Sequence, residues 1–323
     1  MAGADVMAED KRQPKQVNQS LLTVLIAFLA NLLIAIAKSV AAVITSSASM
    51  LAEAAHSWAD AGNEILLLIA DRRSDRRRDS RHPMGFGREA YVWSMFAAFG
   101  LFTAGAVVSI WHGVQELIKP EEASNYLVAY VVLAIAFVLE GVSFTQATMQ
   151  ARRLAAVRDS SVANLVLNTS NPTLRAVFFE DAAALIGIGI AAVGVALHQA
   201  TGSVIPDAIG SILVGVLLAV VAVVLIDRNR RFLVGEVVRP EVRQRVLRDL
   251  LARPEIDRIT YLHLEYVGPG RLYLVASVDM AGDDVEHSVA VRLRRVEGEL
   301  EQQEGIEEAV LTLATPDEVS LLP

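Results

Sequence analysis

The sequence predicts an all-α membrane domain of six transmembrane helices, followed by a small soluble α+β domain. Of the 323 residues, 53% are hydrophobic and 20% are charged, and the mean hydropathy is +0.41. That composition is too apolar for an ordinary soluble domain. The long apolar runs end near residue 230, and shorter amphipathic segments follow. We therefore expect a cytoplasmic N-terminal tail at 1–19, a six-span transmembrane domain at 20–230 and a cytoplasmic α+β domain at 231–323.

The six expected spans are the long apolar segments of the chain. A helix needs about 20 such residues to cross the hydrocarbon core of a bilayer. The segments are Leu21–Ile44, Ser47–Ala70, Tyr91–Trp111, Tyr126–Met149, Val177–Leu197 and Val204–Ile226. The second is the least apolar, so hydropathy alone can miss it. No cleavable signal peptide is expected, because the first run is long enough to span.

The basic residues of the connecting loops predict the orientation. The connection between the second and third spans holds Arg72, Arg73, Arg76, Arg77, Arg78, Arg81 and Arg88, whereas the three connections on the other side hold only Lys119. By the positive-inside rule both termini are cytoplasmic, and we expect a bacterial-type inner or plasma membrane. Nucleic-acid or headgroup binding by these arginines is a weaker interpretation, because topology already explains them.

The segment after Arg231 reads as a separate folded unit. "PEVRQRVLRDLLAR" has the spacing of an amphipathic helix, and "IDRITYLHLEYV" and "RLYLVASVDM" alternate like strands around the turn "GPG". "VEHSVAVRLRRVEGELEQQ" is helical again, and "EEAVLTLAT" reads as a last strand. This order predicts an α+β domain of roughly 90 residues.

The second span carries polar groups that a membrane helix rarely holds. Glu53, His56, Asp60, Asn63 and Glu64 fall in a stripe of about 100° on one helix face. A charged side chain at the bilayer centre costs at least about 2.5 to 3.5 kcal/mol. The stripe is therefore expected to face water, a cation or a partner helix.

His56 and Asp60 point the same way one helical turn apart, which is half of a tetrahedral site for a divalent metal such as Zn²⁺. The chain has no cysteine, so further ligands must be His, Asp, Glu, Asn or carbonyl groups. Counting residues along the spans places Glu140, Glu180 and Asp181 at a depth similar to that of Asp60. Glu180 and Asp181 are about 100° apart, so one of them is expected to face the site directly.

Structural interpretations of the same residues stay open. His56 and Asp60 could form a buried hydrogen-bonded pair that only packs helices. Glu140 could support a network with Thr145 or Gln146 rather than bind metal. Lys38 is expected to snorkel or to neutralise a carboxylate.

Several motifs together resemble the cation diffusion facilitator family over nearly the whole chain after the tail. They are "SSASMLAEAAHSWADAGNE", "RHPMGFGRE", "VFFEDAAALIGIGIAAVGV" and "PDAIGSILVGVLLA". "NPTLRAVFFEDAAA" and "LEGVSF" are similar to the branch that contains the organellar zinc transporter homologues. The resemblance implies a homodimer that exports Zn²⁺ in exchange for protons. It also implies a metal held between the second and fifth spans, and a cytoplasmic domain with a ferredoxin-like or metallochaperone-like fold.

The paired family motif maps onto His56 and Asp60, and the fifth-span motif onto Asp181. Val177 stands where that motif has its first ligand, so Glu180, Glu140, Asn63 or water is left to complete the site. A set richer in oxygen ligands would suit Mn²⁺ or Fe²⁺ better. The family's loop site retains Asp79 and His82, but Phe86 replaces its second histidine. The cytoplasmic metal site keeps His287, while Leu313 and Thr315 stand at expected ligand positions.

Metal binding to His56 and the carboxylates must release protons, which predicts metal/proton antiport if the site opens alternately to the two sides. A channel is less well supported, because the polar groups cluster at one depth. A membrane-anchored metal sensor or scaffold predicts ligands in the soluble domain, where few are found. An enzyme is not expected, because no cysteine nucleophile, phosphate loop or serine triad is visible.

Overall fold

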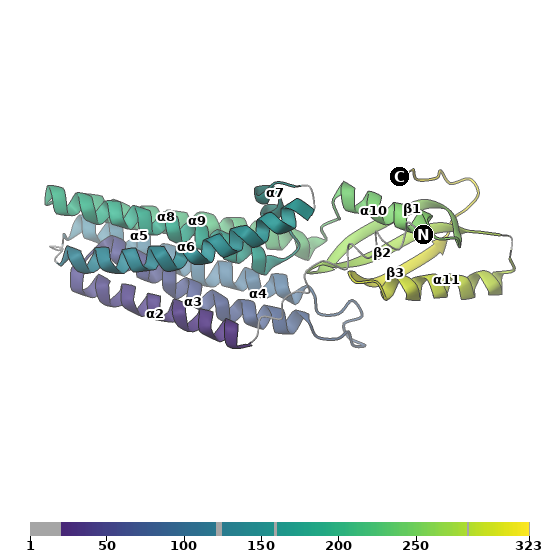
Figure 1. Ribbon diagram of the computed structural model, residues 1–323, viewed down its shortest axis with the longest axis horizontal. Helices are drawn as coiled ribbons and strands as arrows, with labels where there is room; N and C mark the ends of the chain where they lie inside the picture. The colour runs from purple at the N-terminus through teal and green to yellow at the C-terminus, as the bar shows by residue number, and fades with distance from the viewer. Residues whose placement is uncertain (1–20, 121–124, 158–159, 283, 323) are drawn as a thin grey trace.

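A computed structural model describes residues 21–120, 125–157, 160–282 and 284–322, and the tail expected at 1–19 lies outside the described residues. A bundle of long helices is followed along the same axis by a small α+β unit (Figure 1). The bundle helices are α2 (Leu21–Thr45), α3 (Ala48–Ser74), α4 (Glu89–Ala97), α5 (Thr103–Ile118), α6 (Tyr126–Val157), α7 (Val162–Asn168), α8 (Pro172–Thr201) and α9 (Ile205–Val234).

Five helical stretches of the described chain are long and apolar enough to cross a membrane. They are Phe28–Thr45, Glu89–Ile118, Tyr126–Ala156, Pro172–Thr201 and Ile205–Val234. The stretch Glu89–Ile118 is one continuous helix made of α4, a π-helical segment at Ala98–Phe102, and α5. The chain is thus an integral membrane protein by length and composition of its helices.

The remaining expected span, α3, is not among the five, because its polar stripe lowers its hydropathy. It is nevertheless 27 residues long and packs against α2, α4, α5, α8 and α9, with Glu53, His56, Asp60 and Asn63 buried. A helix surrounded in this way meets protein more than lipid, so it does not need an apolar surface on every side.

The start of α3 is held by a residue from a distant helix. Ser47 Oγ and the Ala48 N–H group donate hydrogen bonds of 3.0 and 2.7 Å to the carboxylate of Asp207. Ser49 Oγ donates one of 2.7 Å to the Asp207 carbonyl oxygen. Asp207 stands in the first turn of α9, where its sequence position suggests an N-cap for its own helix. The structure assigns its side chain to the N-terminus of α3 instead.

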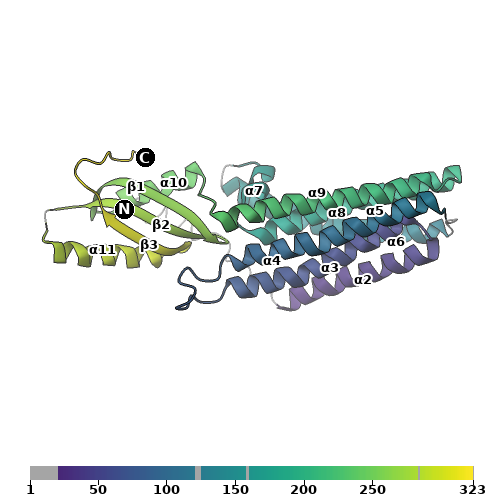
Figure 2. The same ribbon diagram turned by 180° about the vertical axis from the view of Figure 1, so that it is seen from behind.

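The C-terminal unit has the predicted order of helix, strand, strand, helix and strand. It consists of α10 (Pro240–Leu251), β1 (Ile256–Gly268), β2 (Arg271–Met280), α11 (Glu286–Glu301) and β3 (Ile306–Leu313). β1 pairs antiparallel with β2, which pairs parallel with β3. Apolar residues such as Leu247, Leu274 and Val296 join both helices to the sheet in one core. Figure 2 shows this unit beyond the ends of α3, α4 and α9.

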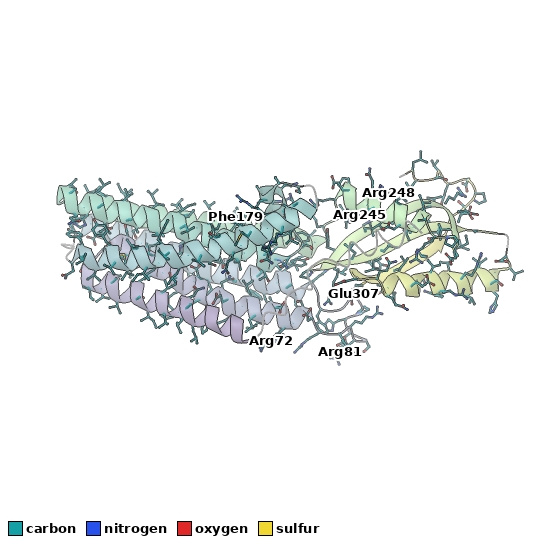
Figure 3. All side chains as sticks on the ribbon, in the orientation of Figure 1. Arg72, Arg81, Phe179, Arg245, Arg248 and Glu307 are labelled. Atoms are coloured by element: carbon teal, nitrogen blue, oxygen red, sulfur yellow. The ribbon has the colours of Figure 1, made fainter. Side chains whose placement is uncertain are left out.

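Contacts between the two parts gather at the connection after α3. Asp75 accepts a hydrogen bond of 3.0 Å from Arg271, and Arg88 is paired with Glu265. A Cβ atom on Gly87 would stand 2.6 Å from the carbonyl oxygen of Val267, so the two backbones touch there. Figure 3 shows Arg72, in the last turn of α3, and Arg81, on this connection, at the end of the bundle nearest the α+β unit. The C-terminal unit therefore contacts the connection that immediately follows α3, the helix that carries His56 and Asp60.

Candidate functional site

His56 and Asp60 lie inside the bundle on α3, as their spacing predicts. His56 Nε2 is 3.5 Å from Asp60 Oδ1, and both side chains are buried. Neither ring nitrogen of His56 nor Asp60 Oδ1 has a hydrogen-bond partner among the described residues. A buried polar atom without a partner is rare in a folded protein, and it commonly marks a functional position. A purely structural hydrogen-bonded pair would have satisfied these atoms.

The carboxylates of the neighbouring helices lie around Asp60. Glu180 on α8 accepts a hydrogen bond from Asn63 Nδ2 of α3, while Asp181 accepts one of 2.8 Å from Ser143 on α6. Asp60 interacts electrostatically with Glu180, Glu140 and Asp181. All three carboxylates and Asn63 are at most 8% exposed. The structure thus brings the six residues predicted from the sequence into one buried region between α3, α6 and α8.

The region holds pairs of side chains rather than one assembled ligand shell. Within the described part of the chain, no group of three or more His, Asp or Glu side chains is arranged to hold a metal ion. Glu180 is engaged by Asn63, and Asp181 by Ser143. A tetrahedral ion needs about four donors near 2 Å. Binding at this place therefore requires the side chains to exchange their present partners for the ion.

Two more polar pairs join α2 to the same face of α3. Asn31 donates a hydrogen bond of 2.7 Å to Glu64, and Lys38 Nζ lies 2.8 Å from Glu53 Oε2. Lys38 thus neutralises a carboxylate, one of the two roles expected for it. Every member of the polar stripe on α3 now has a neighbouring helix beside it. The stripe thus faces neighbouring helices and not lipid, and within it the facing atoms of His56 and Asp60 are left without a hydrogen-bond partner among the described residues.

The seam between α3 and α8 depends on residues that carry no charge. A Cβ atom on Gly187 would collide with Glu53 Oε1 and stand 3.6 Å from His56 Nδ1. Further along, a Cβ on Gly194 would stand 2.9 Å from Ser49 Oγ. Ser143 and Gly187 were not singled out from the sequence. The placement of Ser143 three residues after Glu140 was an available signal, because residues so spaced share a helix face.

Gly187→Ala should displace the polar side chains of the seam, because the added methyl group takes the place of Glu53 Oε1. We expect weaker Zn²⁺ binding by about tenfold, in the range found when a residue that positions a metal ligand is changed. Isothermal titration of the purified protein measures it. Gly189→Ala on the same helix is the matched control, because apart from its chain neighbours and the backbone of its own helix no atom of the described residues lies within 4 Å of its added Cβ. Equal affinities for the two variants would contradict the expectation.

Val177, which stands at a family ligand position, packs against the apolar cluster that includes Ala59, Phe102 and Leu218. The structure gives it a packing role.

In the loop between α3 and α4, His82 Nδ1 lies 2.9 Å from Asp79 Oδ1, with both side chains about half exposed. The hydrogen bond from His82 holds the pKa of Asp79 below its ordinary value.

The histidines of the loop and of the C-terminal unit lie outside the bundle. The ring centroid of His82 lies 4.2 Å from that of Phe86, with the two rings tilted by 35°; Phe86 is the residue that replaces the second loop ligand. His263 Nε2 lies 3.6 Å from Glu265, a carboxylate already paired with Arg88. His287 lies in the first turn of α11. The buried pair of His56 and Asp60, whose facing atoms have no hydrogen-bond partner among the described residues, is therefore the stronger candidate for metal binding.

Comparison with known proteins gives matches over the bundle and beyond it. Residues 24–234 match the cation efflux transmembrane domain. The chain is 35% identical over 253 residues to metal tolerance protein C4 of Arabidopsis thaliana, a match that covers 78% of this chain and 55% of that protein. It is 35% identical over 251 residues to the mitochondrial proton-coupled zinc antiporter SLC30A9 of Homo sapiens, covering 78% and 44%, and 34% identical to that of Mus musculus.

The match spans about half the length of these curated relatives. The names of the animal relatives place those proteins in mitochondria, so they lend no support to the bacterial-type plasma membrane expected from the sequence.

Proposed function

The chain belongs to the cation diffusion facilitator family, and from this premise we propose that it is a secondary active transporter, not an enzyme, that exports Zn²⁺ in exchange for protons. The metal would be carried between α3 and α8, with His56, Asp60 and Asp181 as its principal ligands. Glu180, Glu140 and Asn63 would complete or support the site. The relatives named as proton-coupled zinc antiporters support this choice of substrate and counter-ion.

One observation carries the proposal. His56 and Asp60 are buried in the middle of a membrane bundle, yet the polar atoms that face each other have no hydrogen-bond partner in the described chain. Such atoms are expensive to keep in a protein interior unless a ligand uses them. Carboxylates on α6 and α8 that interact with Asp60 supply the additional negative charge that a divalent cation needs.

The transport step follows from the chemistry of these ligands. Imidazole and carboxylates bind a cation only in their deprotonated forms, so loading the ion releases protons and reprotonation expels it. The present partners of the carboxylates, Asn63 and Ser143, lie on α3 and α6. A rocking motion of α3 and α6 against α8 would break these bonds and open the site to the other side.

A second candidate is a Mn²⁺ or Fe²⁺ transporter of the same architecture. The observation in its favour is the apolar packing of Val177, which leaves His56 as the nitrogen ligand in a set otherwise made of oxygen donors. Harder divalent ions prefer such oxygen-rich sites.

The remaining architecture is proposed on the same premise. α3 would join the five apolar stretches as a transmembrane span, the second of six in chain order, since its length is sufficient and its polar face is covered by protein. Both termini would be cytoplasmic, which places the arginine-rich connection after α3 on the inside. The α+β unit would resemble a metallochaperone and help to form a homodimer.

The test is metal uptake into proteoliposomes that contain the full chain, with Zn²⁺ and Mn²⁺ in parallel and with or without an imposed pH gradient. We expect Zn²⁺ flux that the gradient accelerates, together with proton movement in the opposite direction. Zn²⁺ flux that does not depend on the pH gradient would contradict the proposed exchange for protons. Mn²⁺ flux without Zn²⁺ flux would favour the second candidate. Binding without flux of either ion would indicate a membrane-anchored sensor or scaffold.

A further inference from the structure

The ion pair between Lys38 and Glu53 is the feature of the bundle that the transport site does not use. Its ammonium nitrogen and carboxylate oxygen are 2.8 Å apart, and the two side chains are 1% and 0% exposed. An ion pair this deeply buried gains little stability over a pair of well-packed apolar residues, because both charges lose their hydration. A role in function is therefore a reasonable explanation for its presence.

Half of the Glu53 carboxylate points away from the lysine. Oε1 is buried and has no hydrogen-bond partner among the described residues, and the same is true of His56 Nδ1. Both atoms lie within 4 Å of the point where a Cβ on Gly187 would stand, so they come close together beside the α8 backbone. An oxygen and a nitrogen that can each bind a cation are thus neighbours, and neither has a hydrogen-bond partner among the described residues.

The imidazole of His56 lies between two carboxylates as a result. Its Nε2 lies 3.5 Å from Asp60 Oδ1, and its Nδ1 lies near Gly187 on the side of Glu53 Oε1. Glu53 lies nearly one turn before His56, toward the end of α3 that is farther from the C-terminal unit (Figure 1). A cation that moves along α3 could pass from one side of the ring to the other.

Lys38 already shows that a positive charge is stable on Glu53. Its ammonium group also interacts electrostatically with Glu140 on α6, so a second carboxylate is available if an incoming ion displaces it. A lysine side chain has a long flexible stem and can exchange partners by rotation about its own bonds. The ammonium group would then stay beside a carboxylate after it leaves Glu53, and the charge of the incoming ion is offset by the protons that its ligands release.

We propose that Glu53 and His56 Nδ1 form a second cation position, which a divalent metal occupies on its path through the bundle by displacing the Lys38 ammonium toward Glu140. This inference rests on the proposed transport function and extends it. Lys38 acts as a built-in counter-cation that keeps the second position closed until a metal reaches it. The absence of a side chain at Gly187 is what allows Glu53 Oε1 and His56 Nδ1 to come close enough to bind one ion.

The test counts Zn²⁺ ions bound per chain, by equilibrium dialysis of the full protein in nanodiscs with Zn²⁺ alone. In Lys38→Met the resident ammonium is absent, so we expect about one more bound ion per chain than in the wild type. With both positions filled, His56 bridges the two ions as an imidazolate, and its remaining ring proton is released to the solvent. Lys38→Arg keeps the positive charge and should bind the wild-type number. Lys38→Met combined with Glu53→Gln removes both charges, leaves no unpaired buried charge, and should also return to the wild-type number.

Transport by the doubly substituted protein gives a second reading that does not depend on the folding of Lys38→Met. Because Glu53 lies on the proposed path, we expect Zn²⁺ flux to fall by about tenfold while binding at His56 and Asp60 is retained. Wild-type flux in this variant, or an unchanged ion count in folded Lys38→Met, would overturn the inference and leave the proposed function standing. Absence of Zn²⁺ binding by the wild type itself would instead overturn the proposed function.

Discussion

Asp60→Asn should reduce Zn²⁺ flux in proteoliposomes to the background of empty vesicles. The substitution keeps the size of the side chain but removes the charge that faces His56 Nε2 at 3.5 Å. Loss of a residue that merely supports a metal ligand reduces affinity by about 10- to 100-fold, so loss of a ligand should have at least that effect. It also removes a group whose deprotonation couples metal loading to proton release.

The control for this substitution is Asp227→Asn on α9. Asp227 is a carboxylate near the end of a bundle helix, and it accepts hydrogen bonds from the exposed side chains of Arg230 and Arg231. The Asp227→Asn variant should transport Zn²⁺ at the wild-type rate. Size-exclusion profiles of both variants establish that they are folded. A folded Asp60→Asn protein with wild-type flux would move the transport site away from α3.

The resemblance of the sequence to the cation diffusion facilitators is confirmed, and much of the fold could be predicted from hydropathy and spacing. The apolar runs give helices because only a helix satisfies its own backbone in a membrane. The alternation in "IDRITYLHLEYV" and "RLYLVASVDM" gives the paired strands β1 and β2. In the site, the stripe on α3 was predictable because the positions of His56 and Asp60 follow directly from helix geometry.

The partners of these residues could not be predicted in the same way. Glu180 and Asp181 are adjacent in sequence, yet one bonds to α3 and the other to α6. Which of the two carboxylates meets α3 and which meets α6 depends on how the three helices are rotated against each other. The spacing of residues within one helix does not determine this rotation. The position of Asp207 near the start of α9 suggests a cap for its own helix, and the contact with α3 emerges only when the two helix ends are brought together.

Asp207→Ala should lower the free energy of unfolding by roughly 3 to 6 kcal/mol. The carboxylate accepts hydrogen bonds from Ser47 Oγ and from the Ala48 N–H group, and each hydrogen bond to a buried charged group contributes about 1.5 to 3 kcal/mol. Ala48 opens α3, so its N–H group has no partner within the helix and would be left buried without one. Unfolding of the reconstituted protein by denaturant, followed by circular dichroism, measures the change.

Asp207→Asn separates the loss of the hydrogen bonds from the loss of charge. Its amide oxygen can still accept from the Ala48 N–H group, and its amide nitrogen can donate to the Ser47 hydroxyl, so most of the stability should return. Asp227→Ala removes a carboxylate from the same helix that does not bond to α3, and it should leave the unfolding free energy unchanged. If the Asn and Ala variants at 207 lost the same stability, the charge of Asp207 rather than its geometry would hold the start of α3. In either case the position of His56 depends on this contact, because the helix that carries it begins at the residue that Asp207 binds.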